Sequence, residues 1–579
     1  MSKRTKKRNA RIRRIVFGVI VLALVATIGF LLLDDPTLLN SVNPFVTATP
    51  SPTPTLEPTA TPEPTATPVP TAVPTQEPTA TPEPLPPQEI DEDAIAKAQK
   101  PNNLGVSTEI YNRNGERVAG FAAQEGESFQ GGAYYTSLEG VTTFRGNNYR
   151  DGGAYGRVPA GASTLMIAYS MDVGSTGPYT GVGWSAQPAI VRWTPEQLDR
   201  MNIYESKKAA DGLTEVICAA QDGLIYFFDL NDGMPTRDPI SVGAPVKGSV
   251  TVDPRGYPLL YVGQGTDRVD GTEIECGMRI FSLTDGSLLY FLDGRDSQAT
   301  NDWVACDSAP LLCGDTLIWP SENGLIYLLE LNTTLSDGGV SVAPQVSKYV
   351  YTRPKGKRTG VEGGAAAYNH YLYFADNAGL ITCLDLNNGK PVWCFDAGDD
   401  TDASLVLEED DKGNVYLYTC NELDLSGATG TVQLRCLDAL LGEQIWCQEV
   451  SVRDNQLGGC FATPALGRGA VEDMVFFTVA RGAEGNLLLA FDKRTGNKVW
   501  TLDLGGYAWS SPTLSCDAEG GAYLFQATSA GMLHMIDASS GEIITSIELG
   551  SNIEGSPALF DDMLVIGTRG GKIYGIEIG

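Results

Sequence analysis

The sequence predicts an all-β fold, an eight-bladed β-propeller of four-stranded antiparallel blades preceded by one transmembrane helix and a Pro/Thr-rich linker. A strand-turn-strand phrase, A-x-D-x-x-T-G-x-x-x-W in its cleanest copy at Ala490–Trp500, recurs at spacings of 45 to 55 residues. This is the period of a propeller blade. Eight small-residue steps, often ending in proline, each precede an apolar strand. They begin at Ser185, Lys247, Asp307, Glu362, Asp402, Phe461, Trp509 and Glu554.

The N-terminus predicts a signal anchor. Residues 1–14 carry eight basic and no acidic side chains, and residues 15–33 are nineteen uncharged, mostly apolar residues. At ~1.5 Å per residue this run measures ~28 Å, enough to cross a bilayer core. The basic flank should remain in the cytoplasm as a short tail, which places the rest of the chain outside the membrane.

A linker and a small extension separate the anchor from the repeats. Residues 34–90 are predicted to be an extended linker, because residues 44–87 hold 15 of the 34 prolines and proline favours polyproline II. Residues 91–141 form an N-terminal extension with a hairpin turning at Asn114-Gly115. The sequence leaves its packing open.

Residues 142–579 are assigned to the propeller. The recurring phrase supplies the third and fourth strands of a blade: its Asp bonds amides in the turn, its Gly accepts positive φ, and its Trp fills the gap to the next blade. The final blade ends at Gly579, so Thr164–Gly174 is expected to supply its fourth strand and close the ring. The predicted docking residues are Asp385, Trp393, Asp438, Trp446, Asp492 and Trp500.

The phrase and the segment FRGN-x-x-R at Phe144–Arg150 resemble the propellers with pyrroloquinoline-quinone (PQQ)-type repeats. That family includes quinoprotein alcohol dehydrogenases and the propeller lipoprotein of outer-membrane assembly. The resemblance implies eight blades between about Thr142 and Gly579. It also implies that a member using PQQ would stack it between a tryptophan and a disulfide of adjacent cysteines, beside a calcium ion. No Cys-Cys dipeptide occurs here, so we expect a non-enzymatic member without PQQ.

The eight steps define a candidate binding site. If their first residues are equivalent, they form a ring at one mouth of the central channel, with Trp184 and Trp303 nearby. Carboxylates in such a ring would suit Ca²⁺ or a polar ligand. A hydrated channel mouth without a ligand is the alternative. The candidate ligand-binding residues are Lys247, Asp307, Glu362, Asp402, Trp509 and Glu554.

Two cysteine pairs, Cys383 with Cys394 and Cys436 with Cys447, stand symmetrically about the turns of successive phrases. Directly opposed strand residues lie within disulfide range, so two bridges are predicted in an oxidising compartment. Buried free thiols are the alternative.

From Asp34 onward the chain has 33 basic and 71 acidic residues, a charge near −38. This excludes a nucleic-acid partner, which needs a basic surface. We therefore expect a membrane-anchored extracytoplasmic module that binds or scaffolds protein or cell-envelope ligands. Its layout is similar to that of Gram-positive surface proteins. The alternative function is a PQQ-dependent dehydrogenase using the central channel.

Overall fold

The computed structural model describes residues 86–121, 126, 128–184, 186–208, 212–354, 359–425, 429–453 and 458–579. The predicted cytoplasmic tail, the anchor at 15–33 and the linker up to residue 85 lie outside the described residues. Among the residues that are described, no helix is both long and apolar enough to cross a membrane. Residues from Pro82 to Gly579 form one compact unit.

Strands of this unit form consecutive antiparallel groups of four, here called group 1 to group 8 in chain order. Group 1 consists of β8 (Ala189–Trp193), β9 (Leu213–Ala219), β10 (Leu224–Asp229) and β11 (Ile240–Ser241), and group 2 of β12 (Thr251–Val252), β13 (Leu259–Gly263), β16 (Gly277–Ser282) and β17 (Leu288–Asp293). Group 3 consists of β18 (Leu311–Cys313), β19 (Thr316–Pro320), β20 (Leu325–Glu330) and β23 (Gln345–Thr352), and group 4 of β24 (Ala366–Tyr368), β25 (Tyr371–Ala375), β26 (Leu380–Asp385) and β27 (Lys390–Asp396).

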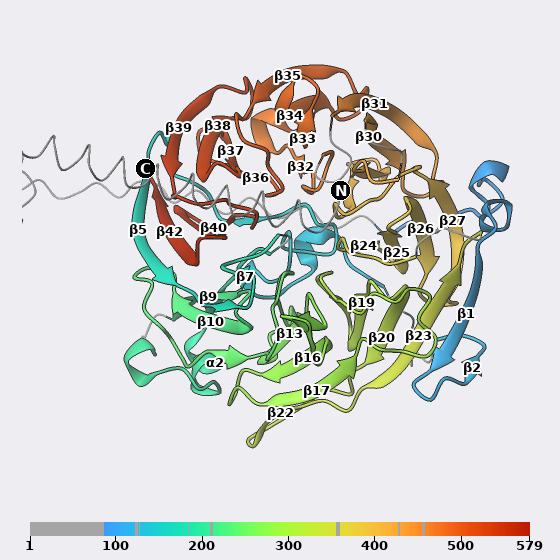
Figure 1. Cartoon of the computed structure of the whole chain (residues 1–579), viewed down its shortest axis with the longest axis horizontal. Coiled ribbons are helices and arrows are strands. Elements are labelled where there is room, and N and C mark those ends of the chain that lie inside the picture. The colour runs from blue at the N-terminus through green and yellow to red at the C-terminus, as the bar shows by residue number, and fades with distance from the viewer. Residues whose placement is uncertain are drawn as a thin grey trace, which may run out of the picture. The chain divides into compact units, whose positions relative to one another are not determined.

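The second half repeats the pattern. Group 5 consists of β28 (Val406–Glu409), β29 (Val415–Cys420), β30 (Gly430–Asp438) and β31 (Gln444–Val452), and group 6 of β32 (Ala465–Leu466), β33 (Met474–Gly482), β34 (Gly485–Asp492) and β35 (Lys498–Asp503). Group 7 consists of β36 (Thr513–Cys516), β37 (Ala522–Ala527), β38 (Met532–Asp537) and β39 (Ile543–Glu548), and group 8 of β40 (Ala558–Phe560), β41 (Met563–Thr568), β42 (Lys572–Ile578) and β5 (Leu165–Asp172). Figure 1 shows the groups arranged around a common centre. The predicted all-β propeller architecture is confirmed.

Both faces of each group are apolar, because each group packs against a neighbour on either side. Along one strand, alternate side chains serve the two interfaces: Val191 packs toward group 2, whereas Ile190 packs toward group 8. Eight buried clusters each join one pair of neighbouring groups. The last of these joins group 8 to group 1, so the ring of cores is continuous.

The closing strand comes from the N-terminal side of the repeats, as predicted. β5 pairs antiparallel with β42 from Leu165 opposite Ile578 to Asp172 opposite Lys572. The ends of this ladder are held by a 2.6 Å ion pair between Lys572 and Asp172 and by amides of residues 163 and 164 that donate to the carbonyl of Gly579. Closure from both ends of the repeat region gives the last group a complete set of four strands.

Each phrase tryptophan packs onto the next group. The indole of Trp393 is fully buried and its Nε1 donates to the carbonyl of Ala439 at 3.0 Å. Its ring lies on Gly442, where φ is 69° and a Cβ would come within 2.6 Å of the indole. Trp446 and Trp500 meet the glycines of the following phrases in the same way. The glycine of one phrase therefore makes room for the tryptophan of the phrase before it.

The phrase aspartates act within their own turns. Asp385 accepts the amide of Asn387 at 2.8 Å, and Asp492 accepts the amide of Thr495 at 2.8 Å. Asp438 accepts two amides, those of Leu440 and Leu441. These carboxylates hold the four-residue turn shape that brings the third and fourth strands together.

The two predicted disulfides are wrong. Cys383 stands opposite Trp393 and Cys394 opposite Thr382, because a β-bulge shifts the register between residues 383 and 384. The bulge adds one residue to the outer strand, so the two thiols point to opposite faces of the sheet. The same shift separates Cys436 from Cys447. Cys383, Cys394, Cys436 and Cys447 therefore carry free thiols.

The N-terminal extension packs on the outside of groups 3 and 4. The predicted hairpin forms between β1 (Ser107–Asn112) and β2 (Arg117–Val118). β1 adds to the outer edge of β23 along its whole length (Figure 1). The turns η2 (Lys97–Gln99) and η3 (Pro101–Leu104) contact β27 instead. The extension therefore covers two neighbouring outer edges of the propeller.

The remaining elements connect the groups. β3 (Glu139–Val141) pairs with β8, and β4 (Ala154–Tyr155) runs parallel to β40. Short hairpins and turns fill the loops: β6 (Ser175–Thr176), β7 (Tyr179–Thr180), β14 (Arg268–Val269), β15 (Thr272–Glu273), β21 (Thr334–Ser336), β22 (Gly339–Ser341), α2 (Pro195–Asp199), η4 (Gly132–Tyr134), η5 (Glu205–Lys207) and η6 (Gly469–Val471).

Segment Thr142–Gly153 crosses the centre of the ring and closes the channel there; we call it the plug. Arg145 donates from its guanidinium to the carbonyls of Pro464 and Pro512 in groups 6 and 7. Arg150 donates to the carbonyls of Ala309 and Ala365 in groups 3 and 4. Both arginines are buried, and burial lowers the pKa of each to about 10.

The plug also pairs with the remaining groups through its backbone. Its carbonyls accept the amides of Val252, Leu407 and Leu559 in groups 2, 5 and 8. The amide of Arg145 donates to Gln187 Oε1, just before group 1, at 2.7 Å. One short segment thus contacts, in every group, the inner strand or the residues just before it, where the edge of the sheet would otherwise leave backbone groups unpaired.

Replacing Trp393 by alanine should lower the free energy of unfolding by ~3–5 kcal/mol, because it leaves a cavity in the interface between groups 4 and 5. The measurement is urea unfolding followed by far-ultraviolet circular dichroism. Trp303→Ala is the matched control, since that side chain is 57% exposed and its loss should change stability by less than ~0.5 kcal/mol. Equal effects of the two substitutions would contradict the docking role of Trp393.

Candidate functional site at the channel mouth

The step residues line the channel on the side of the plug where a small cavity remains. A ladder of hydroxyls runs around it: Ser404 Oγ accepts the amide of Gly364, Thr463 Oγ1 that of Ser404, and Ser511 Oγ that of Thr463. Each hydroxyl therefore fastens one group to the preceding one. The cavity enclosed here has about 20 Å³, room for about one water molecule.

One half of the mouth is aromatic. The rings of Trp184, Phe461 and Trp509 lie 4.9 to 6.4 Å apart between centroids and line the cavity together. Phe461 and Trp509 begin the steps of groups 6 and 7, so these two predicted mouth residues meet there. Phe461 is buried in this contact, and the two tryptophans are partly buried.

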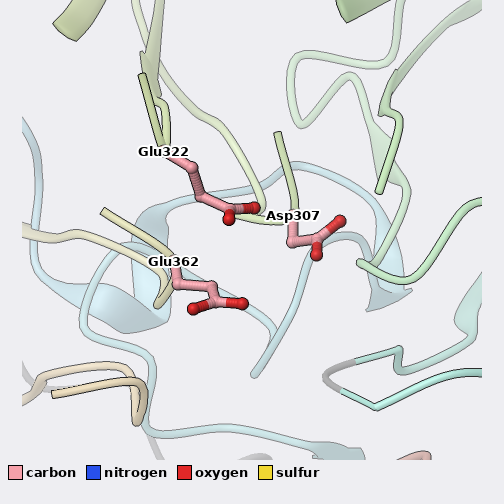
Figure 2. A group of neighbouring side chains, drawn as sticks. All are labelled: Asp307, Glu322 and Glu362. Atoms are coloured by element: carbon pink, nitrogen blue, oxygen red, sulfur yellow. The ribbon is translucent and has the colours of Figure 1, made fainter. Parts of the chain in front are cut away.

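The other half is acidic. Asp307 and Glu362 begin the steps of groups 3 and 4, and Glu322 follows β19 of group 3. One carboxylate oxygen of each lies within 4.8 Å of the others, and Figure 2 shows the three side chains beside one another. We call this set cluster A. Asp307 is 3% and Glu322 is 2% exposed.

A second set of three carboxylates, cluster B, lies beside the first. It consists of Asp400, Asp402 and Glu422, again with one oxygen of each within 4.8 Å. Asp402 begins the step of group 5, and Glu422 follows β29 of the same group. The charge of Glu362 in cluster A acts on all three of these carboxyls, so six acidic groups share one electrostatic environment.

Burial and mutual repulsion disfavour the ionised forms. Burial, followed by the charge of Glu362, raises the pKa of Glu322 and Asp402 well above their usual values. The same causes raise the pKa of Asp400 to about 8, and burial together with Asp400 raises that of Glu422 to about 9. pKa shifts of this size are typical of sites where several like-charged groups are held close together and away from water.

Lys247 is the predicted cation of the ring, and it does reach cluster A. Its Nζ lies 3.5 Å from Asp307 Oδ2. Burial opposes its charge, but Asp307, Glu322 and Glu362 outweigh burial and raise its pKa. The separation is too long for a strong hydrogen bond, and both carboxylate oxygens of Asp307 have no hydrogen-bond partner among the described residues. One ammonium group therefore does not satisfy the six carboxylates.

The structure brings together five of the six predicted ligand-binding residues and diverts one. Glu554 Oε2 accepts from Arg569 at 2.9 Å and its Oε1 from Asn552 at 2.8 Å, so this carboxylate is satisfied locally. Ser185, which begins the first step, lies outside the described residues. Trp303 is solvent-exposed and does not line the cavity.

Sequence reasoning missed half of the acidic residues: Glu322, Asp400 and Glu422. The repeat pattern of the sequence contains a signal that could have identified Glu322 and Glu422. Glu322 and Glu422 each stand two residues past the end of the second strand of their group, where Gln221 and Asn377 stand in groups 1 and 4. Equivalent positions in a repeat map to equivalent places around the ring, so this second set could have been aligned with the first.

A family profile described as outer membrane protein assembly factor BamB matches residues 483–579. Two curated proteins of that name also match. The one from Kangiella koreensis is 24% identical over 200 residues, 34% of this chain and 46% of the relative. The one from Francisella salina is 25% identical over 142 residues, 24% of each protein. The chain thus spans less than half the length of the curated relatives it matches. The predicted resemblance to the PQQ-type repeat propellers is confirmed.

Solved structures support the propeller fold. A quinohemoprotein alcohol dehydrogenase from Comamonas testosteroni superposes with a TM-score of 0.51 at 12% identity, covering 76% of this chain and 80% of that chain. A second such enzyme, from Pseudomonas putida HK5, gives a TM-score of 0.52 at 11% identity with the same coverage. At these identities the likeness concerns the fold.

The residues that line the channel do not fit a quinone of the kind used by the enzymes that this chain resembles. The cavity of about 20 Å³ is far below the ~300 Å³ or more of an organic-ligand pocket. Plug residue Phe144 lines it from one side and Trp184, Phe461 and Trp509 from another. The chain also lacks the adjacent cysteines that the family's enzymes use.

The acidic clusters predict an unusual pH dependence of stability in metal-free buffer. Unfolded Asp and Glu ionise near pH 4, whereas folded Asp400 and Glu422 retain protons up to pKa values of about 8 and about 9. The folded state binds more protons in this window, so its stability is full below about pH 4 and falls as the pH rises toward 9. Thermal unfolding between pH 5 and pH 9 measures the fall.

The matched control for this pH dependence is the double variant Asp400→Asn, Glu422→Gln, which keeps side-chain size and removes both titrating groups. Its melting temperature should change less than that of the wild type across the same interval. Parallel curves for the two proteins would contradict the assignment of the titration to cluster B.

Proposed function

We propose that this protein is an extracytoplasmic β-propeller that binds a protein of the cell envelope and acts as a scaffold. In this proposal groups 1 to 8 are the eight blades of one ring. Residues 15–33 anchor the chain in the cell membrane, residues 34–90 act as a spacer, and the propeller stands outside. The apolar run and the proline content of the sequence support this arrangement.

The observation that carries the proposal is the pairing of β1 with β23. Six residues of an extended segment, Ser107–Asn112, add as an antiparallel strand to the outer edge of group 3. An outer edge of this propeller therefore accepts an added strand, and the group beneath it has the same four-stranded order as the others. Strand addition to a sheet edge is a common mode of peptide recognition, in which backbone bonds give affinity and alternate side chains give specificity.

Other outer edges carry exposed apolar side chains. Val499 on β35, Ile543 and Ile544 on β39, and Met166 and Ile167 on β5 are 36% to 55% exposed. These strands are the terminal members of their sheets among the described strands. The corresponding residue of group 4, Val392, is buried. Exposed apolar side chains along an open edge mark an interaction surface.

The matched relatives support a protein ligand. They are named as outer membrane protein assembly factors, and we infer from the shared repeat that this chain likewise binds a protein in the envelope. The acidic surface agrees with this, since a charge near −38 from Asp34 onward disfavours adhesion to anionic lipid and nucleic acid.

A PQQ-dependent dehydrogenase is the alternative, because two of the structural neighbours are quinohemoprotein alcohol dehydrogenases. The small cavity left in the channel, about 20 Å³, argues against this alternative. Reconstitution of the purified protein with PQQ and calcium, followed by dye reduction with alcohols or sugars, tests this alternative. We expect no saturable quinone binding and no turnover. Substrate-dependent dye reduction would overturn the scaffold proposal.

The edge surface is tested by the double substitution Val499→Lys, Ile544→Lys. Lysines on an open edge oppose strand addition and remove the apolar contact, while both positions are exposed, so the fold should be kept. Retention of envelope proteins on the immobilised full-length protein should fall at least tenfold, and cross-links from the wild type should map to β35 and β39. Mass spectrometry of cross-linked peptides provides the measurement.

Met234→Lys is the matched control, because Met234 is 58% exposed and lies in the loop between β10 and β11 of group 1, not on β35 or β39. It should leave retention unchanged. Undiminished retention by the double lysine variant, or an equal loss with the control, would place the binding surface elsewhere.

A further inference from the structure

We propose that the channel mouth holds two divalent cations of the Ca²⁺ class, one in cluster A and one in cluster B. The six carboxylates come from groups 3, 4 and 5, so the two ions would fasten three consecutive groups together. This inference rests on the side chains of the described residues and does not depend on the scaffold proposal.

The spacing of the oxygens fits calcium. In each cluster the three ligand oxygens lie within 4.8 Å of one another. Ca²⁺ binds oxygen at ~2.3–2.6 Å, so oxygens around one ion are at most ~5 Å apart. Mg²⁺ at ~2.1 Å would need a tighter set and near-octahedral geometry. The limit of 4.8 Å therefore admits one Ca²⁺ in each cluster.

Buried oxygens without partners provide a second observation. Glu322 Oε1, Asp400 Oδ1 and both oxygens of Asp307 make no hydrogen bond among the described residues. These three residues are 2% to 4% exposed. A buried anionic oxygen without a donor is costly. The charges that act on these carboxyls include further carboxylates and, for Asp307 and Glu322, that of Lys247. A cation between the oxygens would satisfy them.

The charge balance calls for more than one ion. Six ionised carboxylates and Lys247 carry a formal charge of −5. One divalent ion would leave −3, and two would leave −1. The two clusters are adjacent through Glu362, so an ion in one would lower the repulsion on the other while each keeps its own three ligands.

The ligand chemistry is that of a hard cation. All six side chains offer oxygen, and neither cluster contains histidine or cysteine. Zinc and copper prefer nitrogen and sulfur, whereas Ca²⁺ takes carboxylate and amide oxygens. Asn377 stands beside cluster A, where its Nδ2 donates to Glu362 Oε2 at 3.5 Å. The proposed ions would be coordinated by protein side chains, and their binding requires no quinone.

The test measures metal binding by the full-length protein after removal of bound metal with a chelator. Equilibrium dialysis with Ca²⁺ should give two ions per chain, and Ca²⁺ should raise the melting temperature. Tb³⁺ should show luminescence on excitation of tryptophan, because Trp184 and Trp509 line the same cavity as Asp307, Glu362 and Asp402. Ca²⁺ should displace this signal at lower concentration than Mg²⁺.

Two isosteric variants separate the clusters. Glu322→Gln should reduce the stoichiometry from two to one, and Asp400→Asn should do the same independently. The combination should bind no ion and gain no thermal stability from Ca²⁺. Because each variant removes an uncompensated buried charge, it should still fold, and its melting curve in chelator verifies this.

Glu554→Gln is the matched control, since Glu554 is paired with Arg569 and belongs to neither cluster. It should bind two ions. Absence of Ca²⁺ binding at millimolar concentration, or an unchanged stoichiometry in both cluster variants, would overturn the proposal. Binding of only one ion per wild-type chain, with that ion lost in either cluster variant, would replace the proposal with one shared site.

Discussion

The hydrogen bonds that Arg145 and Arg150 make across the centre of the ring are the interaction on which the rest of the structure depends. Inner strands of a propeller present an unpaired edge, and their backbone groups need partners. Two guanidinium groups, rich in donors and rigid, reach carbonyls of four different groups. The backbone of the same plug serves the others.

Plugging the ring decides what the channel can do. The plug takes the space at the centre, and the aromatic residues crowd one half of the mouth, so a cavity of about 20 Å³ is left. The acidic residues of the other half are thereby held away from water and close together, which raises their pKa values. In the proposed function, recognition of a large ligand falls to the outer strands, to one of which β1 is added as a strand.

Neighbouring groups are joined by contacts that each repeat makes with the next. Trp393 lies on Gly442 of the following phrase, and Ser404 receives the amide of Gly364 from the preceding group. Each copy of the phrase therefore contributes to two interfaces between groups. Its tryptophan contacts the following group, and its glycine contacts the tryptophan of the preceding one. This explains why both residue types recur at a fixed distance from the same turn.

Local chemistry by itself determined the strands, the turns held by Asp385 and Asp492, and the use of an early segment, β5, to complete the final group. Turn shape and strand alternation depend on residues close together in the chain, and closure follows from counting strands. Only the tertiary structure decided which side chains meet. A bulge of one residue separated Cys383 from Cys394, Arg569 drew Glu554 away from the ring, and Glu322 and Glu422 joined it from a different strand end. These outcomes depend on register and on the angle between neighbouring groups, which are set by packing across the whole ring rather than by any local stretch of sequence.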